Sequence, residues 1–210
     1  MIINAFSTEI WQSHDKLPEH DNIHSWILGL YNQSPVKDGN FYGTGFTTHF
    51  YDDWTSNLEE IEEFQGLKNL ILRNAHEYVA QQLVKLAHLG CPINTNPQLR
   101  IRKMWFNINP THGYQGRHHH AGFLLAGTYY VSVPEHSGRI EFTNPNSFAY
   151  YKNQSLAHKW LLNNYYAFEP QAGDMLLWPG HLDHEIKTNK SKDPRITVSF
   201  CLDWNDECQQ

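Results

Sequence analysis

The stretch from residue 125 to residue 142 reads LAGTYYVSVPEHSGRIEF, and it decides the fold class of this chain. Two runs rich in β-branched and aromatic residues, 125–133 and 139–142, flank a segment with Pro134 and Gly138. Such runs, bounded by turn residues, are typical of strands, and a short turn between two of them is typical of a hairpin. We therefore predict two strands that pair around residues 135–138.

The same pattern recurs on both sides of this stretch. Short runs of strand-forming residues, separated by Pro and Gly, lie at 99–108, 165–168, 174–178, 184–187 and 195–202. About eight short strands at such spacing are typical of a sandwich or a jelly roll. The sequence therefore predicts a mainly β core over residues 97–204.

The preceding residues, 1–96, are predicted to be mainly helical. Segments 22–32 and 67–86 carry apolar residues at helical spacing, and the second should be a long helix that covers a sheet. Ser56-Asn57-Leu58-Glu59 has the form of a capping box, and Gly90-Cys91-Pro92 should end the long helix. Helices that precede the strands, without alternating with them, disfavour a doubly wound fold. We expect a single domain over residues 1–210.

The composition excludes several classes of protein. The 210 residues are 40% hydrophobic, which indicates a globular chain, and the net charge of −6 without a basic block argues against nucleic acid as the main partner. No apolar run is long enough to cross a membrane, and the first residues lack a secretory pattern. Cys91, Cys201 and Cys208 are scattered, which favours reduced thiols in the cytoplasm. The sequence is also compatible with a homodimer.

A candidate metal site follows from the histidines of the second half. His118 and His120 would lie on one face of a strand, with His119 facing away, and the distant His184 could complete one face of a metal. Three neutral imidazoles suit Fe(II), Zn(II) or Ni(II). The alternatives are a polar loop of exposed imidazoles, or Asp183 turned inward as the third ligand.

Arg195 is the candidate for binding an anion. It shares a strand face with Thr197 and Ser199, so that a guanidinium and a hydroxyl could hold one carboxylate. A site with three neutral ligands is more positive than one with a carboxylate ligand and favours an anionic cosubstrate. This arrangement suits an iron enzyme that binds a keto acid. The alternative is a surface arginine paired with Asp193 or Glu141.

The Tyr129-Tyr130 pair offers one more candidate. On a strand, one of the two side chains points inward and the other outward, and the inward hydroxyl could donate to the same carboxylate. The alternative is an ordinary aromatic core residue. Trp105, Trp178 and Tyr114 could line an apolar or peptide groove, or belong to the core.

Several of these segments together resemble a known family, the 2-oxoglutarate/Fe(II) oxygenases related to prolyl 4-hydroxylases. The resemblance is carried by Trp105-Phe106-Asn107-Ile108, by His118-x-His120-Ala121-Gly122, by LAGTYYV at 125–131, by His184-Glu185-Ile186, and by RITVSF at 195–200. It covers residues 97–204 well and the rest loosely. The fold that it implies is a double-stranded β-helix, a cupin-like jelly roll, with supporting helices packed on one sheet.

The resemblance also implies roles for individual residues. His118 and His184 match the two histidine ligands, and His120 stands where the prolyl hydroxylases have a carboxylate. Arg195 matches the arginine that clamps the keto acid, and Tyr130 a hydroxyl that assists it. By position, Asn107 and Gln115 are polar candidates near the mouth of the barrel. The predicted cofactor-binding residues are Arg195, Thr197, Tyr130 and Asn107.

The sequence thus predicts an enzyme that uses Fe(II) and 2-oxoglutarate. It would hydroxylate an unknown small-molecule or peptide substrate and release succinate and CO2. Two alternatives stay open. One is a cupin-like dioxygenase with three histidines and no keto acid, and the other is a metal-binding module without catalytic activity on the same scaffold.

Overall fold

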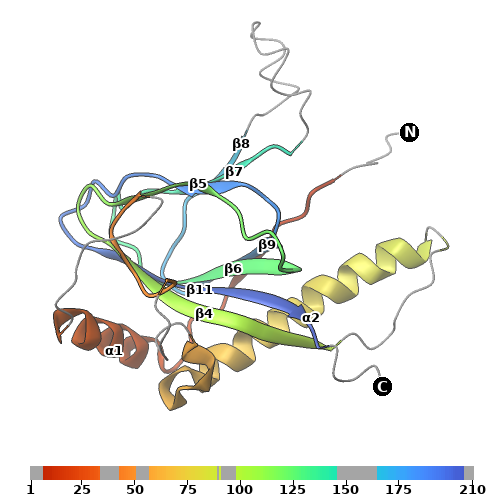
Figure 1. The fold of residues 1–210 in the computed structure, drawn as a ribbon, viewed down its shortest axis with the longest axis horizontal. Coiled ribbons are helices and arrows are strands. Elements are labelled where there is room, and N and C mark those ends of the chain that lie inside the picture. Colours follow the sequence, from red (N-terminus) through yellow and green to blue (C-terminus); the bar gives the residue numbers. More distant parts are fainter. Residues whose placement is uncertain are drawn as a thin grey trace, which may run out of the picture.

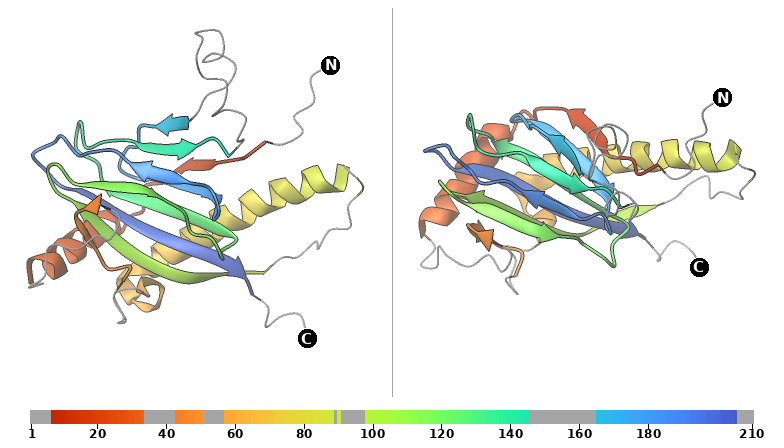
Figure 2. Two further views of the ribbon diagram at one scale, coloured as in Figure 1. Left: turned by 45° about the horizontal axis from the view of Figure 1, so that its top comes forward. Right: turned by 90° about the horizontal axis from the view of Figure 1, so that it is seen from above.

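Two antiparallel sheets face each other in the computed structural model, which describes residues 7–33, 43–50, 57–88, 90, 98–145 and 165–205 (Figure 1). The six-stranded sheet has the order β1 (Trp11–His14), β9 (Asp174–Pro179), β6 (Leu125–Ser132), β11 (Arg195–Trp204), β4 (Leu99–Asn109) and β3 (Phe46–Thr47). The five-stranded sheet has the order β2 (Gly43–Thr44), β5 (Tyr114–His118), β10 (His184–Ile186), β7 (Ile140–Thr143) and β8 (Tyr165–Phe168). This arrangement is the predicted jelly roll, a double-stranded β-helix (Figure 2).

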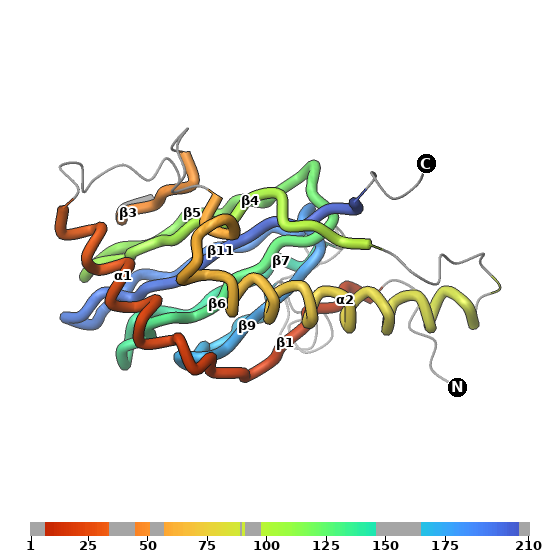
Figure 3. Tube along the Cα trace, turned by 90° about the horizontal axis from the view of Figure 1, so that it is seen from below, coloured from red at the N-terminus to blue at the C-terminus, as the bar shows by residue number. Residues whose placement is uncertain are grey.

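The helices of the described residues cover the six-stranded sheet. They are α1 (His20–Gln33) and α2 (Gln65–His88), with two short 3-10 helices, η2 (Leu58–Glu60) and η3 (Glu62–Phe64), before α2. In Figure 3, α1 and α2 lie across the face formed by β4, β11, β6 and β9. Apolar side chains of both helices share one core with strand residues such as Phe106 and Val198. The prediction of helices that pack on one sheet is therefore confirmed.

The strands of the six-stranded sheet serve two different cores, because side chains alternate between its faces. On β11, Ile196, Val198 and Phe200 pack under the helices, whereas Arg195 and Thr197 face the space between the sheets. On β6, Tyr129 belongs to the helix side and Tyr130 to the inner cluster. The inner face therefore provides polar residues to a space that the two sheets enclose.

The predicted hairpin around residues 135–138 is wrong. Both strands exist, but β6 pairs with β9 and β11, whereas β7 pairs with β10 and β8 in the other sheet. The segment between them crosses from one sheet to the other, and Gly138 adopts a positive φ of 88° there. Strands that follow each other in a jelly roll commonly lie in opposite sheets, so a short connection does not imply pairing.

The N-terminal half is also less purely helical than predicted. It adds β1 and β3 to the six-stranded sheet and β2 to the five-stranded sheet. These strands have two to four residues, too few to show an alternating pattern. The predicted helices correspond to α1 and α2. Gly90, at a positive φ of 74°, donates its N–H to the carbonyl of Ala87 and ends α2, while Cys91 and Pro92 lie outside the described residues.

Three further sequence expectations can be compared with the structure. Ser56 of the expected capping box lies outside the described residues, and η2 begins after Asn57 without a side-chain cap. Cys201 is a buried free thiol, whereas Cys91 and Cys208 lie outside the described residues. Of the helices in the described ranges, none is both long and apolar enough to cross a membrane.

Candidate metal centre and its cavity

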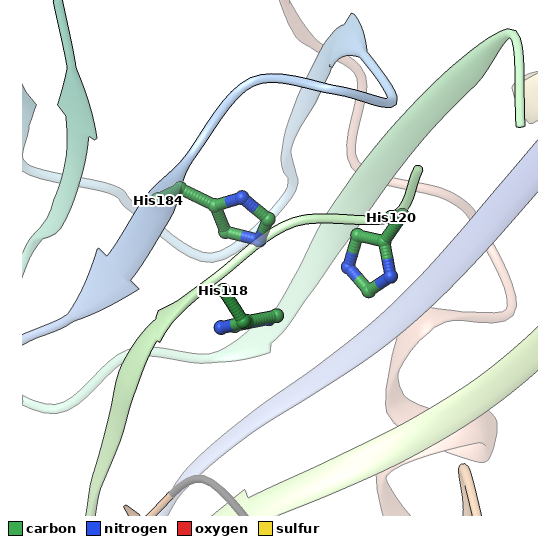
Figure 4. A group of neighbouring side chains, drawn as sticks. All are labelled: His118, His120 and His184. Carbon is green, nitrogen blue, oxygen red and sulfur yellow. The ribbon is translucent and has the colours of Figure 1, made fainter. Parts of the chain in front are cut away.

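Three histidines converge between the sheets, at the side of the five-stranded one (Figure 4). One ring nitrogen of each can be chosen so that all three atoms lie within 4.8 Å of one another. The ring centroids of His118 and His184 are 4.3 Å apart, and those of His120 lie 5.2 Å from His118 and 5.3 Å from His184. This spacing allows three imidazoles to bind one metal ion.

Strand pairing brings the first two of these residues together. His118 ends β5, His184 begins β10, and the two are direct partners in the antiparallel register. The Nδ1 of His118 lies 2.7 Å from the carbonyl of Gly116, and that of His184 lies 3.0 Å from the carbonyl of Leu182. A carbonyl can only accept, so both Nδ1 atoms carry the proton and both Nε2 atoms keep a lone pair for a metal.

The third histidine reaches the site in a different way from the predicted one. His120 is not on a strand, because β5 ends at His118. Its N–H donates to the carbonyl of Gly180, and the N–H of Gly180 donates to the carbonyl of Leu124. A side chain at position 180 would come within 2.9 Å of the His120 carbonyl oxygen. The turn after β9 therefore needs a glycine to hold the His120 backbone in place.

Burial keeps all three imidazoles neutral. Loss of hydration lowers the pKa of His120 to about 3, lowers that of His184 well below its ordinary value, and lowers that of His118. Neutral histidines are the form that binds a metal, so none of the three has to lose a proton at neutral pH. Three neutral imidazoles at this spacing could bind a divalent cation without first releasing protons.

Asp183 does not join the group. Its carboxylate lies 3.3 Å from Nδ1 of His119, and both side chains are about half exposed. Within the described part of the chain, the cluster with metal-ligand spacing consists of His118, His120 and His184, without a carboxylate. In the alternative of an exposed imidazole loop, His118, His119 and His120 would all be exposed, but only His119 is, whereas His118 and His120 are partly buried.

A cavity of about 130 Å³ adjoins the three histidines. Its inner wall is formed by residues of the six-stranded sheet that face away from the helices: Asn107 on β4, Thr128 and Tyr130 on β6, and Arg195, Thr197 and Ser199 on β11. The candidate metal ligands and the candidate anion-binding residues thus line one space, although they come from opposite sheets.

The charged side chain of Arg195 is buried, and no carboxylate of the described residues pairs with it. It is 1% exposed, and its guanidinium donates to Asn109 Oδ1 at 3.0 Å and to the carbonyl of Gly138 at 3.1 Å. Its Nε has no partner, and burial lowers its pKa to about 10, which leaves it charged at neutral pH. A buried cation that meets only neutral groups is costly unless a ligand brings the opposite charge.

The surface alternative for Arg195 is therefore wrong. Glu141, one of its proposed partners, accepts from Arg139 at 2.7 Å and from Lys187 at 3.0 Å instead. Among the described residues no carboxylate lies within ion-pair distance of Arg195, Asp193 included. The guanidinium is available to an anion that enters the cavity.

Tyr130 is the inward member of its pair. Its hydroxyl is buried in the cavity wall without a hydrogen-bond partner, and burial raises its pKa, so the proton stays on the oxygen. Tyr129 is buried on the other face, where its hydroxyl lies 2.8 Å from Nδ1 of His20. Trp178 adds a second buried N–H without a partner, beside His184 at a ring distance of 4.8 Å.

Asn107 and Thr197 belong to a hydrogen-bonded wall. The amide nitrogen of Asn107 donates to Thr197 Oγ1 at 3.3 Å and to Ser199 Oγ at 3.0 Å. Both donor hydrogens of Asn107 are therefore used within the wall, while Thr197 keeps its own hydroxyl proton to donate. Gln115 also lines the cavity, whereas Tyr114 does not. Trp105 and Trp178 line it while being almost fully buried.

Sequence reasoning missed two residues of this site. Asn109, at the end of β4, holds the guanidinium of Arg195 through its side-chain oxygen. His49 lines the cavity next to Trp105. Neither stands in a motif, and each comes to the site only through the pairing of β3, β4 and β11.

The donor set fits a ferrous ion and a keto acid. Three neutral imidazoles on one side of an ion suit Fe(II) and leave further positions for other ligands. The unpartnered Arg195 Nε and Tyr130 hydroxyl are donors, and a carboxylate is an acceptor of such bonds. Fold and site together are those expected of a jelly-roll protein that could hold a metal and, beside it, an anion.

Comparison with known proteins finds one matching family model. Residues 103–201 match the model of the family described as "Putative 2OG-Fe(II) oxygenase", and these residues span most of the jelly-roll core. This match agrees with the predicted enzyme class and cofactors, those of a 2-oxoglutarate- and Fe(II)-dependent oxygenase. No curated protein sequence matches the chain.

Solved structures share the fold at low sequence identity. The α-ketoglutarate-dependent epimerase SnoN from nogalamycin biosynthesis is 16% identical, with a TM-score of 0.62 over 93% of this chain and 77% of SnoN. A prolyl-4-hydroxylase of Pseudomonas putida is 11% identical, with a TM-score of 0.58 over 93% of this chain and 92% of that one. A prolyl hydroxylase of Trichoplax adhaerens is 14% identical, with a TM-score of 0.56 over 96% and 85%.

Proposed function

We propose that His118, His120 and His184 bind the iron of this oxygenase, and that Arg195 holds the far carboxylate of 2-oxoglutarate in the same cavity. One observation carries the proposal: three neutral imidazoles and a buried guanidinium without an anion line one space. The Tyr130 hydroxyl, also unpartnered, is the second donor to the carboxylate, and Thr197 is the third.

The reaction that we propose is hydroxylation of a C–H bond. One O2 and one 2-oxoglutarate are consumed, one oxygen atom enters the substrate as a hydroxyl, and the other enters succinate as CO2 leaves. Iron, when bound, supplies the activation of O2 with electrons from the keto acid. The protein contributes the fixed positions of the ligands and a cavity between two sheets that limits access of water.

The substrate that we propose is a small molecule or a peptide. Among the structural neighbours, SnoN is described with nogalamycin RO, and the Trichoplax hydroxylase with a peptide fragment of a hypoxia-inducible factor degradation domain. We also propose a single domain over residues 1–210, a cytoplasmic location and a homodimer. Size-exclusion chromatography with light scattering would check the homodimer, and fractionation of cells would check the location.

An anaerobic titration tests the proposal. The protein is loaded with Fe(II), 2-oxoglutarate is added, and the visible spectrum is recorded. Direct chelation of iron by the keto acid should give a metal-to-ligand charge-transfer band, and admission of O2 should give succinate. The His119→Ala variant is the matched control, because His119 pairs with Asp183 outside the three-histidine group.

Two outcomes would contradict the proposal. Tight iron binding without the band, and without succinate, would favour a three-histidine dioxygenase that uses no keto acid. Failure to bind Fe(II) at all would favour a module without catalytic activity.

A further inference from the structure

His49 is a cavity residue that the proposed chemistry does not use. It lies after β3, at the side of the cavity formed by Trp105 and Phe50. Its Nδ1 is buried and has no hydrogen-bond partner in the described part of the chain. A buried nitrogen of this kind costs free energy unless a ligand satisfies it.

The position of His49 is fixed by the sheet. Phe46 and Thr47 pair with Ile108 and Asn107 of β4. The next residue, Thr48, donates its N–H to the carbonyl of Phe106 at 3.1 Å and accepts from the N–H of Phe106 at 3.2 Å through its hydroxyl. The N–H of His49 itself donates to Thr47 Oγ1 at 3.2 Å. The ring is therefore presented by an anchored segment, in the way that binding residues usually are.

The His49 ring lies beside the Trp105 ring and farther from His120, a candidate metal ligand. Its centroid lies 4.3 Å from that of Trp105 and 6.1 Å from that of His120, and the Trp105 and His120 rings are 5.6 Å apart. Phe50, half exposed, contacts the outer side of His49 at a ring distance of 4.8 Å. His49 is not in the group with metal-ligand spacing, so a group bound between it and the metal would be part of a substrate.

The charges around the cavity limit what this substrate can be. The residues that line it include five histidines and Arg195 but, within the described ranges, no aspartate or glutamate. The buried Nδ1 of His49, which has no hydrogen-bond partner among the described residues, can donate to or accept from an uncharged polar group. A cation would meet the positive field of Arg195 and the metal without a carboxylate to balance it.

We propose that His49, Phe50 and Trp105 form a substrate subsite for an uncharged group with a flat apolar face and an amide or hydroxyl. His49 is its positioning residue, which hydrogen-bonds that polar group while Trp105 and Phe50 contact the flat face. The inference deepens the proposed function, on which it rests for the place of reaction, and it adds the class of substrate.

A pair of probes, one neutral and one cationic, tests the subsite. N-acetyl-L-phenylalaninamide is neutral, L-phenylalaninamide in its protonated form is a cation, and both carry the same ring. Each is titrated into the Mn(II)-loaded protein, and broadening of the probe ring protons is followed by NMR, with the Zn(II)-loaded protein as diamagnetic control. Mn(II) broadens only protons that bind near it, so the measurement reports the place of binding as well as affinity.

We expect broadening of the neutral probe and binding of the cation that is at least tenfold weaker. Loss of one neutral hydrogen bond in His49→Leu should weaken the neutral probe roughly 2-fold to 12-fold. His49→Gln, which keeps a donor and an acceptor, should recover most of this loss. His88→Leu is the matched control, because His88 lies exposed at the end of α2, and it should leave probe binding unchanged.

Equal affinities for the two probes, no broadening by either, or unchanged binding in His49→Leu would overturn the subsite. The Fe(II)–2-oxoglutarate charge-transfer band, measured on the same variants, separates this failure from that of the proposed function. A normal band without probe effects rejects the subsite alone. A missing band with the expected probe effects rejects the keto-acid proposal and leaves the subsite standing.

Discussion

Two kinds of buried side chain set the chemistry of the cavity. The histidines are neutral because burial depresses their pKa values, whereas Arg195 stays charged because its pKa, though lowered, remains near 10. The first kind suits a metal and the second suits an anion. The two meet in a space where neither has an opposite charge within the described part of the protein.

Replacing Arg195 should affect the keto acid and not the metal. Loss of a charge-assisted contact of about 1.5–3 kcal/mol should weaken 2-oxoglutarate roughly 10-fold to 150-fold in Arg195→Ala. Arg195→Lys should recover part of the affinity, since ammonium lacks the planar fork. Anaerobic titration of the charge-transfer band gives the affinity, and metal analysis gives the iron content. Unchanged affinity in Arg195→Ala would remove this residue from the proposed site.

The third candidate ligand can be tested against its carboxylate counterpart. His120→Ala should lower iron occupancy sharply, because two imidazoles hold a metal less well than three. His120→Asp should keep the metal, because the aspartate supplies a carboxylate oxygen as the third ligand. Equilibrium dialysis against Fe(II) under anaerobic conditions measures both, with His119→Ala as the neighbouring control. Full occupancy in His120→Ala would show that His120 is not a ligand, and Asp183 would be tested next.

The strand β6 contributes residues to both cores. Tyr129 and Tyr130, adjacent in sequence, serve the helix side and the cavity side respectively. Gly127 lies against the ring of Phe200 on β11, and a Cβ at this position would come within 2.7 Å of the Leu176 carbonyl on β9. No side chain fits between these three strands without moving one of them.

Gly127→Ala should therefore destabilise the protein. Overpacking of about 1–3 kcal/mol corresponds to a fall in Tm of roughly 2–12 °C for a chain of this size. Gly29→Ala is the matched control, because among the described residues nothing beyond the neighbouring turns of α1 lies within 4 Å of its Cβ position. Alanine is the better helix former there and should raise Tm by roughly 1–4 °C. Calorimetry that shows equal effects of the two changes would contradict the packing at β6.

Taken together, the two sheets divide the site between them. His118 and His184 come from the five-stranded sheet, whereas Arg195, Thr197 and Tyr130 come from the six-stranded sheet, which α1 and α2 support. A metal with a bound keto acid would therefore add a link between the two sheets, to the apolar contacts and hydrogen bonds, such as that of Arg195 with the Gly138 carbonyl, that already join the two halves. Ligand binding and stability of the whole protein should be coupled.

Thermal unfolding measures this coupling. Mn(II) and 2-oxoglutarate together, each at a hundred times its dissociation constant, should raise Tm, and a single such ligand contributes about 2.7 kcal/mol or roughly 5–11 °C. The protein in EDTA is the reference. Arg195→Ala should keep the increment due to the metal and lose most of that due to the keto acid. A Tm that does not respond to either ligand would contradict a site that spans both sheets.

Local patterns in the sequence were sufficient for the fold class, the long helix α2, most strands of the core and the cluster of candidate residues. Each of those features is visible within a few neighbouring residues. Side chains alternate along β6 and β11, apolar residues recur at helical spacing in α2, and two histidines stand two positions apart in His118-x-His120. The partners of each strand were not local. Pairing of β6 with β9 and β11, instead of β7, is decided by contacts between residues tens of positions apart.

The same physical reason applies to what the sequence left open or missed within the site. His120 rather than Asp183 joins the histidines because its backbone binds Gly180, sixty residues further on. Arg195 is buried without an acid because Asn109, on a distant strand, holds its guanidinium. His49 reaches the cavity only because Thr48 binds Phe106 on β4. A sequence pattern reports which side chains are present, but only packing between distant segments determines which of them share a water-poor space.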